Sequence, residues 1–226
     1  MIKDNIKVLE EEISSICNNC GRHRSDIKLI AVSKTQSIEN IKQALLAGVN
    51  EFGENRAQEL RDKSELIFDN INWHFIGHLQ KNKVKYIIKS SVLIHSIDSK
   101  KLAEEVKTRA EQNNKIQNVL LEIKTSKEAT KFGLLNEDEI FSTTQYCFEA
   151  PSINLIGLMT MAPFTNDEKI IRGSFTQLRN LFEKLNKNGY NLTELSMGMT
   201  NDYRIAIEEG STMLRIGSAI FGERNY

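Results

Sequence analysis

Short apolar runs alternate with longer amphipathic segments about eight times along this chain of 226 residues. The short runs are rich in β-branched residues, as buried strands are, and the longer segments repeat their apolar residues at helical spacing. Such alternation predicts a parallel sheet with helices packed against it. The predicted strands are 27–34, 49–53, 73–77, 92–96, 118–125, 155–161, 192–196 and 213–217. The predicted helices between them include 38–47, 58–69, 81–88, 99–113, 137–146, 167–186 and 202–209.

Eight strand–helix units in roughly 200–250 residues fit a single (β/α)8 barrel of the TIM type. An open doubly wound sheet is the alternative fold, although the first strand is not followed by the G-x-G-x-x-G motif of dinucleotide-binding versions. The apolar residues between Ile2 and Cys20 form one helical stripe, which Gly21 ends. We expect one domain over residues 1–226, in which residues 1–21 form a leading helix packed on the barrel.

The bulk composition excludes several classes of protein. Thirty acidic and thirty basic side chains balance, so the chain lacks the charge footprint of a nucleic-acid binder. No apolar stretch reaches the ~20 residues of a membrane span, and the N-terminal segment has no signal-peptide core. Three cysteines, an odd number, favour a reducing compartment. We therefore expect a cytoplasmic protein with no nucleic-acid or membrane partner, and a monomer, since the leading helix can cap the barrel.

The cysteines and histidines do not predict a metal centre. Cys17 and Cys20 have the spacing of a redox or zinc half-site, but no second pair follows and the motif ends a helix. We interpret them as ordinary thiols. The four histidines lack the spacing of a three-ligand site. His74 and His95 lie within predicted strands, which is typical of hydrogen-bonded structural histidines.

Three segments far apart in the sequence carry matching chemistry. Lys34 ends the first predicted strand, Ser196 ends the seventh and Gly217 ends the eighth. In such barrels, active sites lie at the C-terminal ends of the strands, and a phosphate site often follows strands seven and eight. Because strand eight neighbours strand one in a closed barrel, we expect the three segments to meet at one rim.

The residue types at this rim suit a ligand with a carbonyl and a phosphate. Apolar neighbours and a nearby cation, here Arg215, favour the neutral lysine amine that forms an imine. Gly217 allows close approach of the backbone to an anion, and Ser196 and Ser218 add hydroxyl donors. An imine-forming amine, here Lys34, beside a phosphate cradle is what pyridoxal 5'-phosphate (PLP) needs, because PLP carries an aldehyde and a phosphate.

These motifs, taken together and in this order, resemble the pyridoxal-phosphate homeostasis protein family, the YggS/PROSC group. The resemblance covers nearly the whole chain. The family in turn resembles the N-terminal (β/α)8 barrel of alanine racemases. The matching stretches are Ala31–Thr35, Phe52–Arg56, His74–Gly77, Leu79–Lys83, Gly157–Met159, Ser196–Asp202 and Arg215–Gly222.

The resemblance implies a role for each candidate residue. Lys34 would form the internal Schiff base with PLP, Arg215 would face the pyridine nitrogen, and Asn55 would line the pocket near the ring. The implied phosphate-holding residues are Ser196, Gly217 and Ser218. Met159 would either pack in the pocket or be an ordinary core methionine.

Three positions depart from the family pattern. His78 stands where a proline is usual, and Ser218 replaces a common threonine but keeps the hydroxyl. Lys124 takes the place of an asparagine at the end of the fifth strand, which puts a second amine near the rim. Polar contacts normally made by that asparagine are not expected here.

An arginine at the pyridine nitrogen disfavours its protonation, because arginine stays cationic. The ring is then a shallow electron sink, and alanine racemases that tolerate this add a tyrosine from a further domain of a partner subunit. The sequence ends at Tyr226, directly after the last predicted strand, so no such domain is expected. The leading hypothesis is a PLP-binding protein of vitamin B6 homeostasis, which buffers PLP or delivers it to PLP-dependent apo-enzymes without substantial turnover.

Two alternatives belong to other functional classes. The first is a weak PLP-dependent amino-acid racemase. The second is a class I aldolase, in which Lys34 would form an imine with a sugar phosphate.

Overall fold

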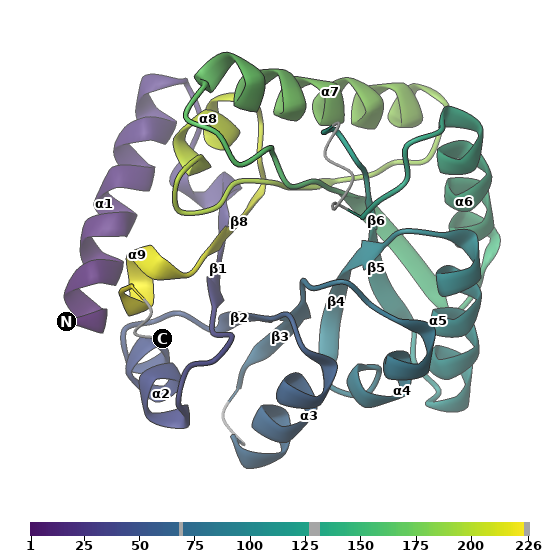
Figure 1. Ribbon diagram of the computed structural model, residues 1–226, viewed down its shortest axis with the longest axis horizontal. Helices are drawn as coiled ribbons and strands as arrows, with labels where there is room; N and C mark the ends of the chain where they lie inside the picture. The colour runs from purple at the N-terminus through teal and green to yellow at the C-terminus, as the bar shows by residue number, and fades with distance from the viewer. Residues whose placement is uncertain (68–69, 127–131, 224–226) are drawn as a thin grey trace.

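The computed structural model describes residues 1–67, 70–126 and 132–223. Eight parallel strands close into a barrel in which neighbours follow chain order from β1 to β8 (Figure 1). The predicted (β/α)8 barrel is therefore confirmed and the open sheet is excluded. The strands are β1 Lys28–Val32, β2 Glu51–Glu54, β3 Asn72–Phe75, β4 Ser91–Ile97, β5 Gln117–Glu122, β6 Ile153–Met159, β7 Glu194–Ser196 and β8 Met213–Ile216.

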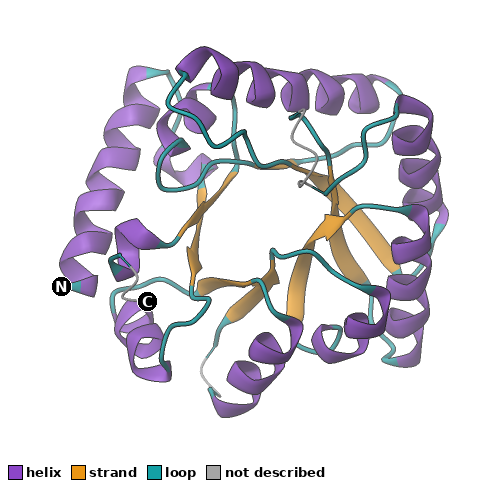
Figure 2. Cartoon of the chain, viewed as in Figure 1, coloured by secondary structure: helices purple, strands orange, loops and turns teal. Residues whose placement is uncertain are grey.

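The helices form the outer layer and surround the ring of strands (Figure 2). They are α1 Ile2–Asn19, α2 Ile38–Leu46, α3 Ala57–Leu66, α4 Val84–Ile87, α5 Lys100–Gln112, α6 Glu137–Glu149, α7 Glu168–Lys187, α8 Tyr203–Glu208 and α9 Ser218–Phe221. In the described ranges, no helix combines the length and apolarity that crossing a bilayer demands.

Two predicted helices differ most from the observed ones. The helix expected over 81–88 divides into a 3-10 turn, Lys81–Lys83, and α4, because the Lys83 N–H donates to the Gln80 carbonyl three residues back at 2.9 Å. The helix expected over 58–69 ends at Leu66, and residues 68–69 lie outside the described ranges. Tyr226, at the other end of the chain, also lies outside them.

The barrel closes where β8 pairs with β1. The pairing is parallel, and its register runs from Lys28 opposite Met213 to Ala31 opposite Ile216. Two further residues beyond Ile216 lead to Ser218, and three beyond Ala31 lead to Lys34. Closure thus brings the segments that follow β1 and β8 to the same part of the C-terminal rim.

The leading helix α1 packs against other helices of the outer layer. Its buried face consists of Ile2, Ile6, Leu9, Ile13 and Cys17, so the predicted stripe holds as far as Ile13, whereas Ile16 is half-buried and Cys20 is exposed. This face meets α2, α8 and α9, and the Asn5 side chain donates to the Ile220 carbonyl at 3.0 Å. α1 therefore covers the helices beside the seam between β8 and β1.

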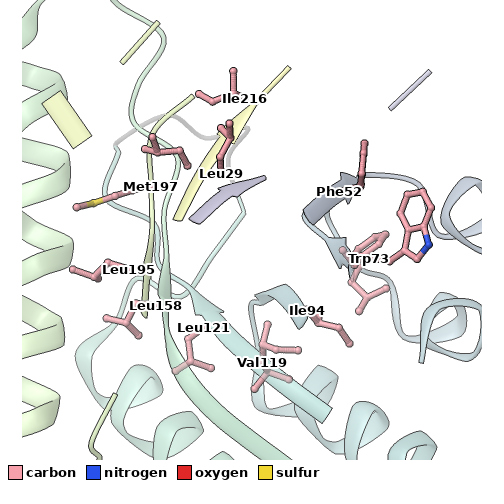
Figure 3. Packing of buried hydrophobic residues seen from close by; sticks show 14 of the residues in the cluster. Leu29, Phe52, Trp73, Ile94, Val119, Leu121, Leu158, Leu195, Met197 and Ile216 are labelled. Carbon is pink, nitrogen blue, oxygen red and sulfur yellow. The ribbon is translucent and has the colours of Figure 1, made fainter. Parts of the chain in front are cut away.

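Strand residues face two separate apolar regions, because successive side chains point to opposite faces of a sheet. The outward-facing ones pack against the helices (Figure 3), among them Leu29, Phe52, Trp73, Ile94, Val119, Leu121, Leu158, Leu195 and Ile216. The barrel interior holds a second cluster formed by Ile30, Leu93, Leu120, Met159 and Met213. Met159 is thus a core residue, 1% exposed.

A polar layer lies one step further towards the C-terminal rim inside the barrel. His95, Glu122 and Arg215 each stand two residues beyond a member of the interior cluster on the same strand, so they share its face. All three side chains are buried. This layer supports the rim where the predicted site residues lie.

Candidate functional site

Lys34 lies in the turn that follows β1. The strand ends at Val32, two residues earlier than predicted. The next residue, Ser33, still donates its N–H to the Gly53 carbonyl of β2 at 3.0 Å. The chain then turns, since the Gln36 N–H bonds back to the Ser33 carbonyl at 2.9 Å and Thr35 takes a left-handed φ of +65°. This tight turn places the Lys34 side chain, half-buried, at the rim.

A cluster of ion-paired side chains is hydrogen bonded to the backbone on both sides of Lys34. On α3, the Lys63 ammonium donates to the Ser33 carbonyl at 2.7 Å and to Glu54 and Glu59, each at 2.8 Å. Glu54 also accepts from the Ser33 hydroxyl at 2.6 Å, and Glu59 accepts from the Thr35 N–H at 2.6 Å. Sequence reasoning missed this cluster: Glu59 and Lys63 stand at the i,i+4 spacing of a helix, but no local pattern indicates that Lys63 also reaches Glu54 and the Ser33 carbonyl.

Gly217 and Ser218 lie at the end of β8, beside the end of β1. A Cβ at Gly217 would lie 3.5 Å from the Cβ of Val32, so the two chain segments are in close proximity here. Ser218 begins α9 and is exposed, and its hydroxyl donates to the Thr200 hydroxyl at 3.1 Å. Because the N–H groups in the first turn of a helix have no partner within it, this corner offers donors to an anion.

Thr200 was not singled out by sequence reasoning. It lies in the predicted 196–202 motif, whose fold depends on Gly198 with φ +98°. A Cβ at Gly198 would lie 2.6 Å from the Cβ of Ala206, so this position requires glycine. The Arg215 N–H donates to the Gly198 carbonyl at 3.0 Å and fixes the loop beside β8. The signal that could have identified Thr200 is its hydroxyl within that loop.

Ser196 and Arg215 contact each other inside the barrel. Ser196 is fully buried, and its hydroxyl oxygen accepts from Arg215 Nη1 at 2.6 Å. Arg215 Nη2 donates to the Thr160 carbonyl at 2.8 Å. Burial lowers the pKa of Arg215 to about 10, so its guanidinium remains charged at neutral pH. The serine predicted to hold a phosphate therefore contacts the arginine of the site.

The two buried histidines extend this contact through the barrel. His95 Nδ1 lies 2.9 Å from the Ser196 hydroxyl, and His95 Nε2 lies 2.9 Å from His74 Nδ1. His74 Nε2 in turn lies 2.6 Å from Glu51 Oε2. Their prediction as hydrogen-bonded structural residues is confirmed. The connection from them to Arg215 was not predicted, because strand register alone does not reveal it.

Asn55 directly follows β2 and is half-buried. A Cβ at Gly77 would lie only 2.2 Å from the Asn55 carbonyl oxygen, so the chain after β3 packs closely against it. Asn55 lines a groove of about 670 Å³ together with Gln36 and Ser37, which follow the Lys34 turn. Asn55 and Lys34 thus belong to neighbouring loops of one rim.

The structure therefore places an amine, a cation and a pair of hydroxyls at the C-terminal ends of three neighbouring strands. Lys34 comes from the end of β1, Arg215 and Ser218 from the end of β8, and Thr200 from the loop after β7.

Lys124, the second rim amine expected from the sequence, follows β5, where its N–H donates to the Leu134 carbonyl at 2.9 Å. Across the described residues, no three His, Cys, Asp or Glu side chains gather in a metal-binding cluster.

Comparison with known proteins identifies close relatives of the chain. Residues 5–225 match the family model "Alanine racemase, N-terminal domain". A pyridoxal phosphate homeostasis protein from Aquifex aeolicus is 43% identical over 221 residues, covering 96% of this chain and 95% of the relative. A protein of the same name from Vibrio cholerae is 38% identical over 230 residues, covering 100% of this chain and 97% of the relative.

A solved structure agrees with these sequence matches. PipY of Synechococcus elongatus, determined with PLP bound, superposes with a TM-score of 0.87 at 29% identity and covers 98% of this chain and 100% of PipY. The family predicted from the motifs is confirmed. This chain belongs to the pyridoxal phosphate homeostasis protein family, whose fold is that of the alanine racemase N-terminal domain.

Proposed function

We propose that this chain binds PLP through Lys34 and serves in the homeostasis of that cofactor. The observation that carries the proposal is the pairing of β8 with β1, with Ala31 opposite Ile216, because it puts the segments of Lys34 and Ser218 at one rim. PipY, a relative of the same fold, is described with PLP bound, and the curated relatives are named for PLP homeostasis.

The residues present fit the two ends of PLP. When bound, the cofactor supplies an aldehyde that condenses with the Lys34 amine. Ser218, Thr200 and the backbone at Gly217 would hold the phosphate, since the two hydroxyls lie 3.1 Å apart beside the first turn of α9. Asn55 would line the pocket from the neighbouring loop.

Arg215 argues for binding rather than catalysis. It is 4% exposed, remains cationic and donates to fixed acceptors. Because it is a cation, it cannot stabilise a protonated pyridine nitrogen as a carboxylate would. The ring would therefore withdraw electrons weakly. The two curated relatives carry names of homeostasis rather than of a reaction, and we propose that turnover by this chain is negligible.

A carrier would release PLP to PLP-dependent apo-enzymes. We propose that this transfer takes place in the cytoplasm and that the chain works as a monomer. Its balanced charge and its three free cysteines, two of them buried, support that environment.

Lys34→Ala tests the assignment against a matched rim amine. PLP added to the wild-type protein should give a visible absorption band, and borohydride should fix the cofactor's mass on the Lys34 peptide. Lys34→Ala should lose both signals, whereas Lys124→Ala should keep them. A band that survives in Lys34→Ala but is lost in Lys124→Ala would contradict the assignment.

Two further measurements separate the alternative functions. Amino acids incubated in D2O with the PLP-loaded protein should show negligible deuterium at Cα, and saturable exchange would favour the racemase. Borohydride should fix nothing on Lys34 when a sugar phosphate is offered without PLP. Trapping of the sugar phosphate there would favour the aldolase.

A further inference from the structure

A continuous series of hydrogen bonds runs along the barrel interior from Glu51 to Arg215. Its links are Glu51–His74 at 2.6 Å, His74–His95 at 2.9 Å, His95–Ser196 at 2.9 Å and Ser196–Arg215 at 2.6 Å. Glu51 is the first residue of β2, so the series starts at the end of the barrel opposite the Lys34 rim. We call these five residues the relay.

We propose that the relay fixes the Arg215 guanidinium at the PLP site, which makes His74, His95 and Ser196 positioning residues for the cofactor. This inference rests on the proposed function for its role, but its geometry stands without the cofactor. It also gives Ser196 a task other than the phosphate contact that the family resemblance implies.

The donors and acceptors of the relay admit one direction when both histidines are neutral. Glu51 is ionised, since hydrogen bonds from His74 and Asn72 outweigh its burial and lower its pKa, so it only accepts. His74 must then carry its proton on Nε2, which leaves Nδ1 to accept from His95 Nε2–H. The free Nδ1 of His95 accepts from the Ser196 hydroxyl.

The Ser196 oxygen, having donated its proton to His95, is left to accept from Arg215. Burial lowers the pKa of His74, and burial lowers that of His95 well below the ordinary value, so both rings are neutral. Hydrogen bonds in series polarise one another. Each link therefore strengthens the hold of Ser196 on the guanidinium.

Two other charged residues begin strands at the same end of the barrel as Glu51. Lys28 is the first residue of β1 and Glu194 the first of β7. Glu194 accepts from the Thr212 hydroxyl at 2.6 Å, makes no hydrogen bond of the relay and acts on His74 only through its charge. Because it carries the same charge at the same end, Glu194 is the matched control for Glu51.

The tautomers are the first test, and they need no cofactor. Long-range 15N–1H NMR on histidine-labelled protein should show His74 and His95 neutral and protonated at Nε2. His23→Asn and His78→Asn remove the signals of the other two of the four histidines. A His95 ring protonated at Nδ1, or charged, would overturn the relay.

The second test compares Glu51→Gln with Glu194→Gln in PLP titrations. Glu51→Gln replaces a charged acceptor by a neutral amide oxygen, and the weaker hydrogen bond from His74 should weaken PLP binding by about three- to tenfold and shift the visible absorption of the bound cofactor. Glu194→Gln should bind with wild-type affinity and spectrum. Equal affinities and spectra in the two variants would overturn the proposal, even if Glu51→Gln melted at a lower temperature.

Variants of His95 test the link to Ser196. In His95→Asn an amide oxygen can replace Nδ1 as the acceptor, whereas His95→Leu offers none. We expect His95→Asn to bind PLP more tightly than His95→Leu, and the reverse order would overturn the proposal. If His95→Leu does not fold, the Glu51 and Glu194 pair still decides.

Failure of the relay and failure of the proposed function give different results. If the wild-type protein does not bind PLP, the proposed function is wrong, and the role of the relay falls with it. If the wild-type protein binds PLP but Glu51→Gln matches Glu194→Gln, only the relay is wrong.

Discussion

Glu122 is a residue whose protonation should affect stability near neutral pH. It ends β5 inside the barrel and is 3% exposed. Burial, reinforced by the negative charge of Asp98, raises its pKa from 4.5 to about 7, although Arg215 acts in the opposite direction. Between these two pH values the folded state holds a proton that the unfolded chain releases, so stability falls as pH rises.

Glu122→Gln should remove that dependence. Relative to wild type, we expect its free energy of unfolding to rise between pH 4.5 and pH 7 by about 3 kcal/mol, at 1.36 kcal/mol for each pKa unit, and to level off above pH 7. Urea denaturation at pH 4.5, 6 and 8 measures this difference. Glu11→Gln, on the exposed face of α1, is the control, and a pH-independent difference for Glu122→Gln would contradict the assignment.

Individual site residues were predictable to different degrees. Lys34, Gly217 and Ser218 could be assigned to one rim because each follows a strand in a fold that determines which strand ends meet. The bonding of Ser196 to His95 and Arg215 could not be predicted, because it depends on three interior side chains of three strands at one height in the barrel. The hydroxyl that the family resemblance assigns to the phosphate is hydrogen bonded within the protein.

The turn between β1 and α2 depends on α3 for its conformation. Lys63, 7% exposed on α3, joins the Ser33 carbonyl to Glu54 and Glu59. Burial raises the pKa of Glu54 even though Lys63 lies beside it. One oxygen of Glu54, Oε2, is buried without a hydrogen-bond partner, so this carboxylate depends heavily on the lysine.

Lys63→Met should therefore destabilise the protein by about 3–5 kcal/mol, the cost of leaving a buried charge unpaired. Replacing Glu54 by Gln in the same chain should recover part of that loss. Denaturant unfolding measures both. Lys101→Met, an exposed change on α5, should stay within about 0.5 kcal/mol of wild type, and a similarly small effect for Lys63→Met would show that the cluster adds little.

At the scale of elements, hydrophobic periodicity located every strand and most helices. The boundaries were less predictable, because side-chain contacts from other elements decide them. β1 stops at Val32 since Ser33 bonds to Glu54 and Lys63, and no local pattern in residues 27–34 indicates this. β7 begins at Glu194, two residues later than the apolar run beginning at Leu192 suggests.

The whole molecule should be a monomer in solution. Its exposed large apolar residues lie on different elements, for example Leu46 on α2, Phe148 on α6 and Phe164 before α7. Scattered apolar residues of this kind are normal for monomers. Sedimentation velocity should show one species near 25.8 kDa over a hundredfold range of concentration, and a species of twice that mass would contradict the prediction.

The seam between β1 and β8 has a consequence for how the protein is made. A ribosome synthesises the Lys34 turn early, but Arg215 and Ser218 emerge only after seven strands have been completed. An unfinished chain therefore carries the Lys34 amine without Arg215 and Ser218. If PLP binds there as proposed, vitamin capture requires the chain to be translated through α9, and incomplete chains destined for degradation would not sequester it.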